Sequence, residues 1–558
     1  MRMNQKRIGK FPPSLTLLVT HCIRRAMGAP GGGMGGGVSA RFRTFLSLFL
    51  LISVCLLTGI AVSATLEERV IEHHLKNGLT LLLMERHHAP IVAVNLTYKV
   101  GGVNEHTGIT GVAHLYEHMA FKGTRTIGVT DAEKERPLLE ELDRLSEAIS
   151  AEIAKGDAAD KTRLAALRDR LTKLDEEAQH YVVPSELAAL YQRNGGVGLN
   201  ATTGKDLTRY FLSLPSNRLP LWAVIESNRM NDVVLREFYK EKQVVMEERR
   251  MRTDNSPSGR LYEAFSSTAY RAHPYGLPVI GWPSDLETLS RGETQAFFQT
   301  YYGPANAIVA IVGDINPKEV IALIEETFGR IPARPPSPPV QTLEPPSAGE
   351  RRVEVEYEAE PALLIGFHKP AAGDPDDDVF DVIESLLSDG RTSRLYRILV
   401  QERQIAAGVS AFSDFPGARY PNLFVVSSVP RAPHTTAELE QAIYEELDRL
   451  KREPVGPREL EKILNQIDAA EVRSLRSNSG MASRLAYSQA ILGDWREIVR
   501  KRNRVAQVTP EDIRRVAVKY FTKSNRTVAT LVKPMPARDL QSLPVAPRPA
   551  DSPEAVKP

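Results

Sequence analysis

An internal repeat is the feature of this sequence that most restricts its fold. Residues 289–312 (LSRGETQAFFQTYYGPANAIVAIV) align without gaps with residues 508–531 (VTPEDIRRVAVKYFTKSNRTVATL), at an offset of 219 positions. Each copy opens with a helix-capping signal and continues as an amphipathic helix, a turn containing Asn and a β-rich run. The capping pairs are Ser290 with Glu293 and Thr509 with Asp512. We therefore expect a duplicated α+β unit.

The remaining pattern favours antiparallel sheets. The segments TLLLME, IVAVNLTY, NAIVAIVG and NLFVVSSV alternate or run apolar, as strands do, and long helical segments separate them. Strands and helices that are mixed in this way suit a sheet with helices packed on one face. The fold class predicted from the sequence is thus α+β, with two homologous domains of this kind.

Two Pro-rich stretches divide the chain, and both are typical of extended linkers or termini. The first begins at Ile331 (IPARPPSPPVQTLEPP), and the second is the tail that begins at Pro534. With a leader of 64 residues, the predicted parts are residues 1–64, an N-terminal domain 65–330, a linker 331–348, a C-terminal domain 349–534 and a tail 535–558.

The first 64 residues predict export. They contain eight Lys and Arg and no Asp or Glu, and Arg41 and Arg43 precede an uncharged, largely apolar run from Thr44 to Leu66. A basic region, an apolar region and small residues at its end are typical of a secretory signal peptide, here cleaved before Thr65. The alternative is an uncleaved membrane anchor. We expect a periplasmic or secreted protein, held at the inner membrane only if the segment is not cleaved.

Charge and cysteine content change once the leader is set aside. The full chain of 558 residues carries 71 basic and 69 acidic side chains, so a dedicated nucleic-acid binder is not expected. Without the leader, 63 basic and 69 acidic residues remain, a net charge of −6. Both cysteines, Cys22 and Cys55, also lie in the leader. Any tight metal site in the rest must therefore use His and carboxylate ligands.

A charged segment from Asp131 to Gln179 stands apart from the rest of the first domain. It holds two leucine stripes at helical spacing, separated by Lys155-Gly156-Asp157. We expect an antiparallel helical hairpin, inserted at residues 131–180. Its role is either a packed structural insertion or an arm that docks a partner or restricts access to a site.

The sequence GVAHLYEHMAFKGT places His114, Glu117 and His118 in an H-x-x-E-H pattern. On a helix, the two imidazoles would lie one turn apart on one face, which suits two ligands of a single Zn²⁺. Glu117 would border the same face and could accept a proton from water. The alternative is two surface histidines beside a solvated glutamate.

A hydrolytic zinc site needs a third protein ligand. The best donor segment is REFYKEKQVVMEERRM, whose carboxylates are Glu237, Glu241, Glu247 and Glu248. Glu241 and Glu248 are seven positions apart and so share a helix face, which suits one metal ligand and one carboxylate that supports a histidine. Spacing alone does not choose between them.

With these motifs, residues from about Glu67 to Lys533 resemble the insulinase/pitrilysin family of inverted zinc metallopeptidases. The bacterial branch similar to mitochondrial processing peptidase is the closest in pattern. The blocks HLYEHMAFKGT, NGGVGLNATTGKDLTRYFLSLP, EKQVVMEERRM and HPYGLPVIG carry the resemblance, in the family's order.

The resemblance implies a role for each motif residue. His114, His118 and Glu248 are implied as ligands of one Zn²⁺ per chain, Glu117 as the general base on the catalytic water, and Glu241 as the supporting carboxylate. Asn200, Ala201 and Thr203 match the edge-strand block that binds the substrate backbone. The second half lacks H-x-x-E-H, so we expect a non-catalytic C-terminal domain.

The sequence departs from the family in two places. His118 and Glu248 are 130 positions apart, which is longer than usual, and the predicted hairpin accounts for the excess. The family's Arg and Tyr near the zinc, seven residues apart, fall here on Val400 and Ala407, and Arg403 is out of register. Some family members are heterodimers in which a homologous zinc-less subunit carries the Arg and Tyr. The resemblance therefore implies that this chain is the zinc-bearing subunit of such a pair and forms half of a clamshell.

The function predicted is a zinc-dependent endopeptidase acting on extended or unfolded peptides, as the zinc-bearing subunit of a heterodimer. The first alternative is a non-catalytic scaffold, a core subunit of an assembly with the same fold. The second is a module that captures peptides without cleaving them. A complete H-x-x-E-H motif with Glu248 favours the enzyme.

Overall fold

The computed structural model describes residues 65–534. The predicted leader and the Pro-rich tail from residue 535 lie outside this range. Among the residues described, none of the helices combines the length and the apolar character needed to cross a membrane.

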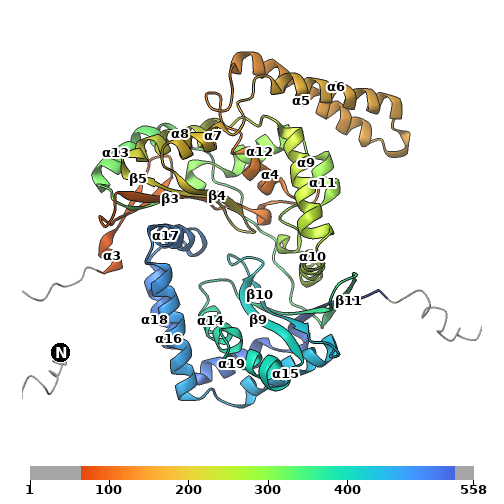
Figure 1. Ribbon diagram of the computed structural model, residues 1–558, viewed down its shortest axis with the longest axis vertical. Helices are drawn as coiled ribbons and strands as arrows, with labels where there is room; N and C mark the ends of the chain where they lie inside the picture. Colours follow the sequence, from red (N-terminus) through yellow and green to blue (C-terminus); the bar gives the residue numbers. More distant parts are fainter. Residues whose placement is uncertain (1–64, 535–558) are drawn as a thin grey trace, which may run out of the picture. The chain divides into compact units, whose positions relative to one another are not determined.

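The first domain is built on a six-stranded sheet, in the order β1-β2-β6-β3-β5-β4 (Figure 1). Neighbouring strands are antiparallel except β2 and β6, which run parallel. The strands are β1 Val70–His74, β2 Thr80–Glu85, β3 Ile91–Tyr98, β4 Val197–Thr203, β5 Thr208–Pro215 and β6 Ala307–Gly313. Its main helices are α4 Val112–Met119, α7 Glu186–Arg193, α8 Leu219–Asp232, α9 Phe238–Arg249, α10 Pro257–Ala269, α12 Arg291–Tyr301 and α13 Pro317–Thr327.

The second domain repeats this plan with five strands, in the order β7-β11-β8-β10-β9. Here too a single pair, β7 with β11, is parallel. The strands are β7 Arg351–Glu356, β8 Ala362–Lys369, β9 Ala406–Phe415, β10 Asn422–Pro430 and β11 Arg526–Val532. The helices are α14 Pro375–Ser388, α15 Thr436–Arg452, α16 Pro457–Ser474, α17 Asn478–Leu492, α18 Glu497–Val505 and α19 Pro510–Tyr520. The predicted α+β class with two homologous domains is confirmed.

The offset of 219 read from the sequence holds element by element. Helix α12 and strand β6 become α19 and β11 when 219 is added to their bounds. Both helices carry the predicted capping boxes. In each turn an Asn side-chain amide, from Asn306 or Asn525, donates to two backbone carbonyls and so ties the helix end to the neighbouring strand.

Each sheet is covered on both faces, and only one of the two covers comes from its own domain. Helices α4, α8, α12 and α13 close one face of the first sheet, and α17 of the second domain closes the other (Figure 1). Reciprocally, α10 of the first domain packs on the second sheet, where its Phe265 lies among Leu364 and Val425. A Cβ on Gly366 would come within 2.4 Å of the Phe265 ring, so a glycine is needed there for this approach.

The predicted hairpin consists of α5 Ala132–Ile153 and α6 Lys161–Gln179 (Figure 1). The side chains of Asp131 and Asp160 cap the two helices, and a short turn at Gly156–Ala158 separates them. Its small core contains Leu139, Leu142 and Ala178. At the base, Arg291 forms a two-pronged ion pair with Asp143, which ties α5 to the start of α12.

Helix α17 of the second domain covers the first sheet, and its Leu485 side chain is 0% exposed there. We therefore expect the stability of the protein to depend strongly on Leu485. Leu485→Ala should lower the free energy of unfolding by about 2–5 kcal/mol, because it leaves a cavity between the domains. Leu343→Ala in the linker is the matched control, since Leu343 is 74% exposed and should change stability by about 0.5 kcal/mol at most. Denaturant unfolding measures both. Equal stability of the two variants would contradict this role for α17.

Candidate metal centre

The N-terminus of the helix that carries the H-x-x-E-H motif is capped by a side chain from outside the helix. Helix α4 begins after Gly111, whose φ of 88° places it in the left-handed region and which offers no capping side chain. The buried carboxylate of Glu105 takes this role by accepting the N–H groups of Gly111 (2.9 Å) and Ala113 (2.8 Å). Burial raises the pKa of Glu105, and the two hydrogen bonds partly offset this effect. A carboxylate at a helix N-terminus also complements the helix dipole.

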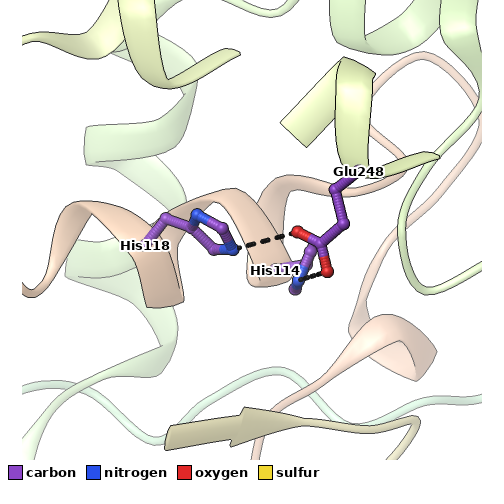
Figure 2. A group of neighbouring side chains, drawn as sticks. All are labelled: His114, His118 and Glu248. Carbon is purple, nitrogen blue, oxygen red and sulfur yellow. Dashed lines mark ion pairs between the residues drawn. The ribbon is translucent and has the colours of Figure 1, made fainter. Parts of the chain in front are cut away.

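Three side chains from two helices converge at one point. His114 and His118 of α4 face Glu248 of α9, and one ligand atom from each lies within 4.8 Å of the others (Figure 2). The Nε2 atoms of His114 and His118 lie 3.8 and 3.4 Å from the two Glu248 oxygens. Tetrahedral zinc with bonds of about 2.0–2.2 Å places its ligand atoms about 3.4 Å apart. The set therefore fits a tetrahedral divalent metal and leaves a fourth position for a reactant.

A second carboxylate fixes the orientation of one imidazole. The Nδ1 of His118 donates to Glu241 (2.9 Å), which leaves Nε2 with its lone pair toward Glu248. Glu241 in turn accepts from the ammonium of Lys122 (2.7 Å). Burial would raise the pKa of Glu241, but these two hydrogen bonds outweigh it and lower the pKa to about 2. Glu241 is therefore an anion at any physiological pH.

The two imidazoles differ in their surroundings. Burial, helped by the neighbouring His118, lowers the pKa of His114 to about 3, so its ring stays neutral and able to ligate. Its Nδ1 is buried without a hydrogen-bond partner among the described residues. Burial also disfavours the charged form of His118, but the hydrogen bond to Glu241 and the negative charges of Glu241, Glu248 and Glu117 together outweigh this and raise its pKa above the ordinary value.

Glu117 lies beside the ligand set without joining it. Its Oε2 accepts the hydroxyl of Thr203 at 2.6 Å. Burial raises the pKa of Glu117, and the hydrogen bond from Thr203 offsets only part of that effect. A positioned carboxylate with raised basicity is suited to take a proton from an attacking water molecule.

The structure distinguishes the four carboxylates of the donor segment, including Glu241 and Glu248, between which spacing did not choose. Glu248 faces the histidine pair and Glu241 supports His118, whereas Glu237 accepts from Lys122 and from Lys240. Glu247 points away and pairs with Arg250 on the surface. The choice is made by the packing of α9 on α4.

The Asn200 block forms the edge of the first sheet. Strand β4 pairs with β5 on one side and has no strand on the other among the described residues. Asn200 is exposed and its side chain accepts from the N–H of Ala201 (2.9 Å), while the Ala201 side chain is buried in the core. Thr203, which the resemblance assigned to substrate binding, has its hydroxyl on Glu117.

Sequence reasoning missed three supporting residues, namely Glu105, Lys122 and Asp285. Asp285 accepts the N–H and hydroxyl of Thr110 and so holds the loop before α4. The lack of a Ser, Thr, Asp or Asn cap ahead of VAHLYEH was a usable signal, because a buried helix start without its own cap needs an acceptor from elsewhere.

Comparison with known proteins identifies the family. Residues 80–153 match the model "Insulinase (Peptidase family M16)", and residues 288–467 match "Peptidase M16 inactive domain". The sequence is 28% identical over 468 residues to zinc protease PqqE of Helicobacter pylori, covering 82% of this chain and 92% of that protein. Both halves of the chain thus match models of the insulinase family, which confirms the resemblance found in the sequence.

Two further comparisons cover most of the chain. An uncharacterised zinc protease of Bacillus subtilis, YmxG, is 23% identical over 462 residues, which are 80% of this chain and 95% of that protein. The crystal structure of a protease from Helicobacter pylori superposes with a TM-score of 0.70 at 27% identity, covering 83% of this chain and 99% of that one. The insulinase model includes α4 with its motif, and the inactive-domain model reaches from α12 into α16.

The hydrogen bond between His118 and Glu241 predicts a measurable effect on metal affinity. Glu241→Gln removes the anion that orients the ring and should weaken zinc binding about 10–100-fold. Glu247→Gln changes a neighbouring exposed carboxylate and should leave the affinity as it is. Zinc competition with a chromophoric chelator measures both. Equal affinities for the two variants would contradict the supporting role of Glu241.

Proposed function

We propose that this protein is a zinc-dependent endopeptidase. The observation that carries the proposal is the convergence of His114, His118 and Glu248 at metal-ligand spacing, with Glu117 beside them. The zinc proteases among the relatives support the same chemistry.

The chain's own groups define the catalytic steps. Zinc, when bound, acts as a Lewis acid that polarises the scissile carbonyl and makes an attacking water more acidic. Glu117 accepts the proton of that water and returns it to the leaving amine. The hydroxyl of Thr203 holds one Glu117 oxygen, which leaves the other oxygen for the proton transfer. Glu241 keeps the His118 ring in the tautomer that ligation needs.

The substrate class we propose is extended or unfolded peptide. The open edge of β4, near Asn200, ends at Thr203 beside Glu117, so a peptide added as a further strand would run toward the reacting groups. Recognition by backbone hydrogen bonds favours shape and extension over a strict side-chain code.

Removal of the general base tests the reaction. Glu117→Gln should lower kcat about 10²–10⁴-fold on an unstructured peptide, because Gln does not accept the proton, while the zinc content stays at one per chain. Glu247→Gln should retain full activity. Stopped assays on a fluorogenic peptide, with metal analysis by mass spectrometry, measure this. Unchanged cleavage by the Glu117 variant would overturn the proposal.

We also propose a homologous zinc-less subunit as partner, for an exported protein. Val400 packs against the core of the second domain, and Arg403 pairs with Glu445 on α15 (2.8 Å). Neither of them, nor Ala407, replaces the Arg and Tyr that the family places near the zinc. In the proposed heterodimer, the zinc-less subunit would supply this Arg and Tyr.

Co-purification tests the partner. A tagged chain isolated from the native host's envelope fraction should bring down a homologous chain that lacks H-x-x-E-H, and the pair should cleave peptide at least about tenfold faster than the isolated chain. Full activity of the isolated chain would contradict the heterodimer but not the peptidase.

A scaffold role is the second candidate, since the C-terminal half matches a family model described as an inactive domain. The complete ligand set in the first domain weighs against it. Zinc binding without any peptide cleavage, alone or with the partner, would favour the scaffold.

A further inference from the structure

The C-terminal domain contains a cavity of about 390 Å³ between helices α14, α16 and α18. Three of its polar lining residues come from α14, namely Asp381, Glu384 and Ser385. Asp468 of α16 and Lys501 of α18 line it as well. None of these residues has a part in the chemistry of the metal centre.

Helix α14 is the counterpart of the helix that carries the metal ligands. Strand β3 pairs antiparallel with β6, as β8 does with β11, and α4 and α14 are the next α-helices after β3 and β8. Each helix is followed by a glycine with positive φ, Gly123 or Gly390, 267 positions apart. With this offset His114 corresponds to Asp381, Glu117 to Glu384 and His118 to Ser385.

Helix α16 is likewise the counterpart of α9, which carries Glu248. Helix α9 packs on α4, and α16 packs on α14. Each is followed by a helix whose N-terminal Ser, Ser256 or Ser477, accepts the N–H of the residue three positions on. The two serines are 221 positions apart, so Glu248 corresponds to Ala469, and the neighbouring Asp468 lines the cavity. The cavity is the duplicate of the metal centre.

The duplicate does not have the geometry of a metal site. Among the described residues, only His114, His118 and Glu248 form a group close enough to share an ion. In the cavity, the ammonium of Lys501 pairs with Asp381 at 2.9 Å, and Arg502 pairs with Asp468. These cations neutralise the carboxylate at the position of His114 and the carboxylate next to the position of Glu248.

Among the described residues, two polar side chains of the cavity lack a partner: Glu384 has no ion-pair partner, and the Ser385 hydroxyl has no hydrogen-bond partner. Glu384 accepts the N–H of Ser413 (2.7 Å) on one oxygen and takes part in none of the ion pairs of the described residues. The buried Ser385 hydroxyl has no hydrogen-bond partner there either. Burial raises the pKa of Glu384 to about 7, with Asp381, Asp389 and Asp414 adding to the effect. A buried carboxylate and hydroxyl of this kind favour a ligand that donates hydrogen bonds.

Apolar side chains form part of the remaining cavity wall, which also contains charged residues. Of these, Arg484 pairs with Glu471 and Arg502 with Asp468, so they balance one another, and Asp389 adds a further negative charge.

Leu464 and Ile467 of α16 and Val505 of α18 line the cavity, and Ala470 lies exposed at its rim. A ligand that fits this cavity has a cationic end, which pairs with Glu384, and an apolar stem. The stem is favoured because it is removed from water when it packs against the apolar side chains.

We propose that this cavity is a second ligand site, which binds an alkyl ammonium or guanidinium group with Glu384 as its counter-ion and the Ser385 hydroxyl as a further acceptor. The cation comes either from a free amine or from a Lys or Arg side chain of a peptide, since both present the same group on the same stem. The site is independent of the metal centre in the other domain.

Calorimetric titration of the full zinc-loaded chain with n-hexylammonium at pH 8, where Glu384 is ionised, tests the site. We expect one amine per chain, and 1-hexanol, which shares the stem but not the charge, should bind at least about tenfold more weakly. Glu384→Gln should weaken amine binding about tenfold or more, because Gln can still accept the Ser413 N–H but carries no charge. Glu248→Gln should not change it, which excludes binding at the metal centre.

Ala470→Trp provides a second variant, since this exposed rim position tolerates bulk and a Trp there should obstruct the cavity. A peptide with one Lys, compared with its acetyl-lysine form, distinguishes a peptide side chain from a free amine as the source. Loss of amine binding in Ala470→Trp and in Glu384→Gln supports the site. No amine binding to the wild-type chain, or binding equal to that of hexanol, would overturn the proposal.

Discussion

The two domains are held together by the burial of the apolar faces of both sheets. Strand β6 is buried along its whole length, because apolar side chains point to both faces of the first sheet. The helices of that domain cover one face only, so α17 of the second domain must cover the other. Helix α10 does the same for the second sheet. Since burial of apolar surface is the main favourable term in folding, neither domain is complete without the other.

The metal centre depends on this frame. Helices α9 and α10 are consecutive in the chain, so the seat of α10 on the second sheet also limits where α9 places Glu248. Helix α4 is fixed from its other end by Glu105 and by the loop that Asp285 holds. Two helices anchored in this way bring the histidine pair of α4 and Glu248, which is 130 positions after His118, to one point, with Glu241 and Lys122 behind them. In the second domain, helices α14 and α16 are arranged like α4 and α9 but carry different side chains.

Local signals made much of this predictable. The capping boxes and the break in the hairpin depend on residues within a few positions of one another, and the repeat aligns two segments that each carry such local signals. The structure has all three where the sequence placed them. The spacing of His114, Glu117 and His118 on one helix face is local as well. The exchanged helices α10 and α17 were not predictable, because an apolar helix face does not reveal which sheet will cover it. The cap on α4 from Glu105 was missed for a related reason, since its donors lie beyond one turn.

The sequence alone determined the duplicated α+β units and the histidine pair with its neighbouring acid, because both follow from short-range periodicity. Spacing also narrowed the third ligand to Glu241 or Glu248, and the family resemblance implied Glu248. The tertiary structure places the two carboxylates, because α9 packs on α4 with Glu248 toward the two imidazole Nε2 atoms and Glu241 toward the His118 Nδ1. It likewise decided that the corresponding place in the second domain is a cavity in which, among the described residues, Glu384 has no ion-pair partner and the Ser385 hydroxyl no hydrogen-bond partner. Ligand geometry depends on how two distant helices meet, and a one-dimensional pattern does not contain that information.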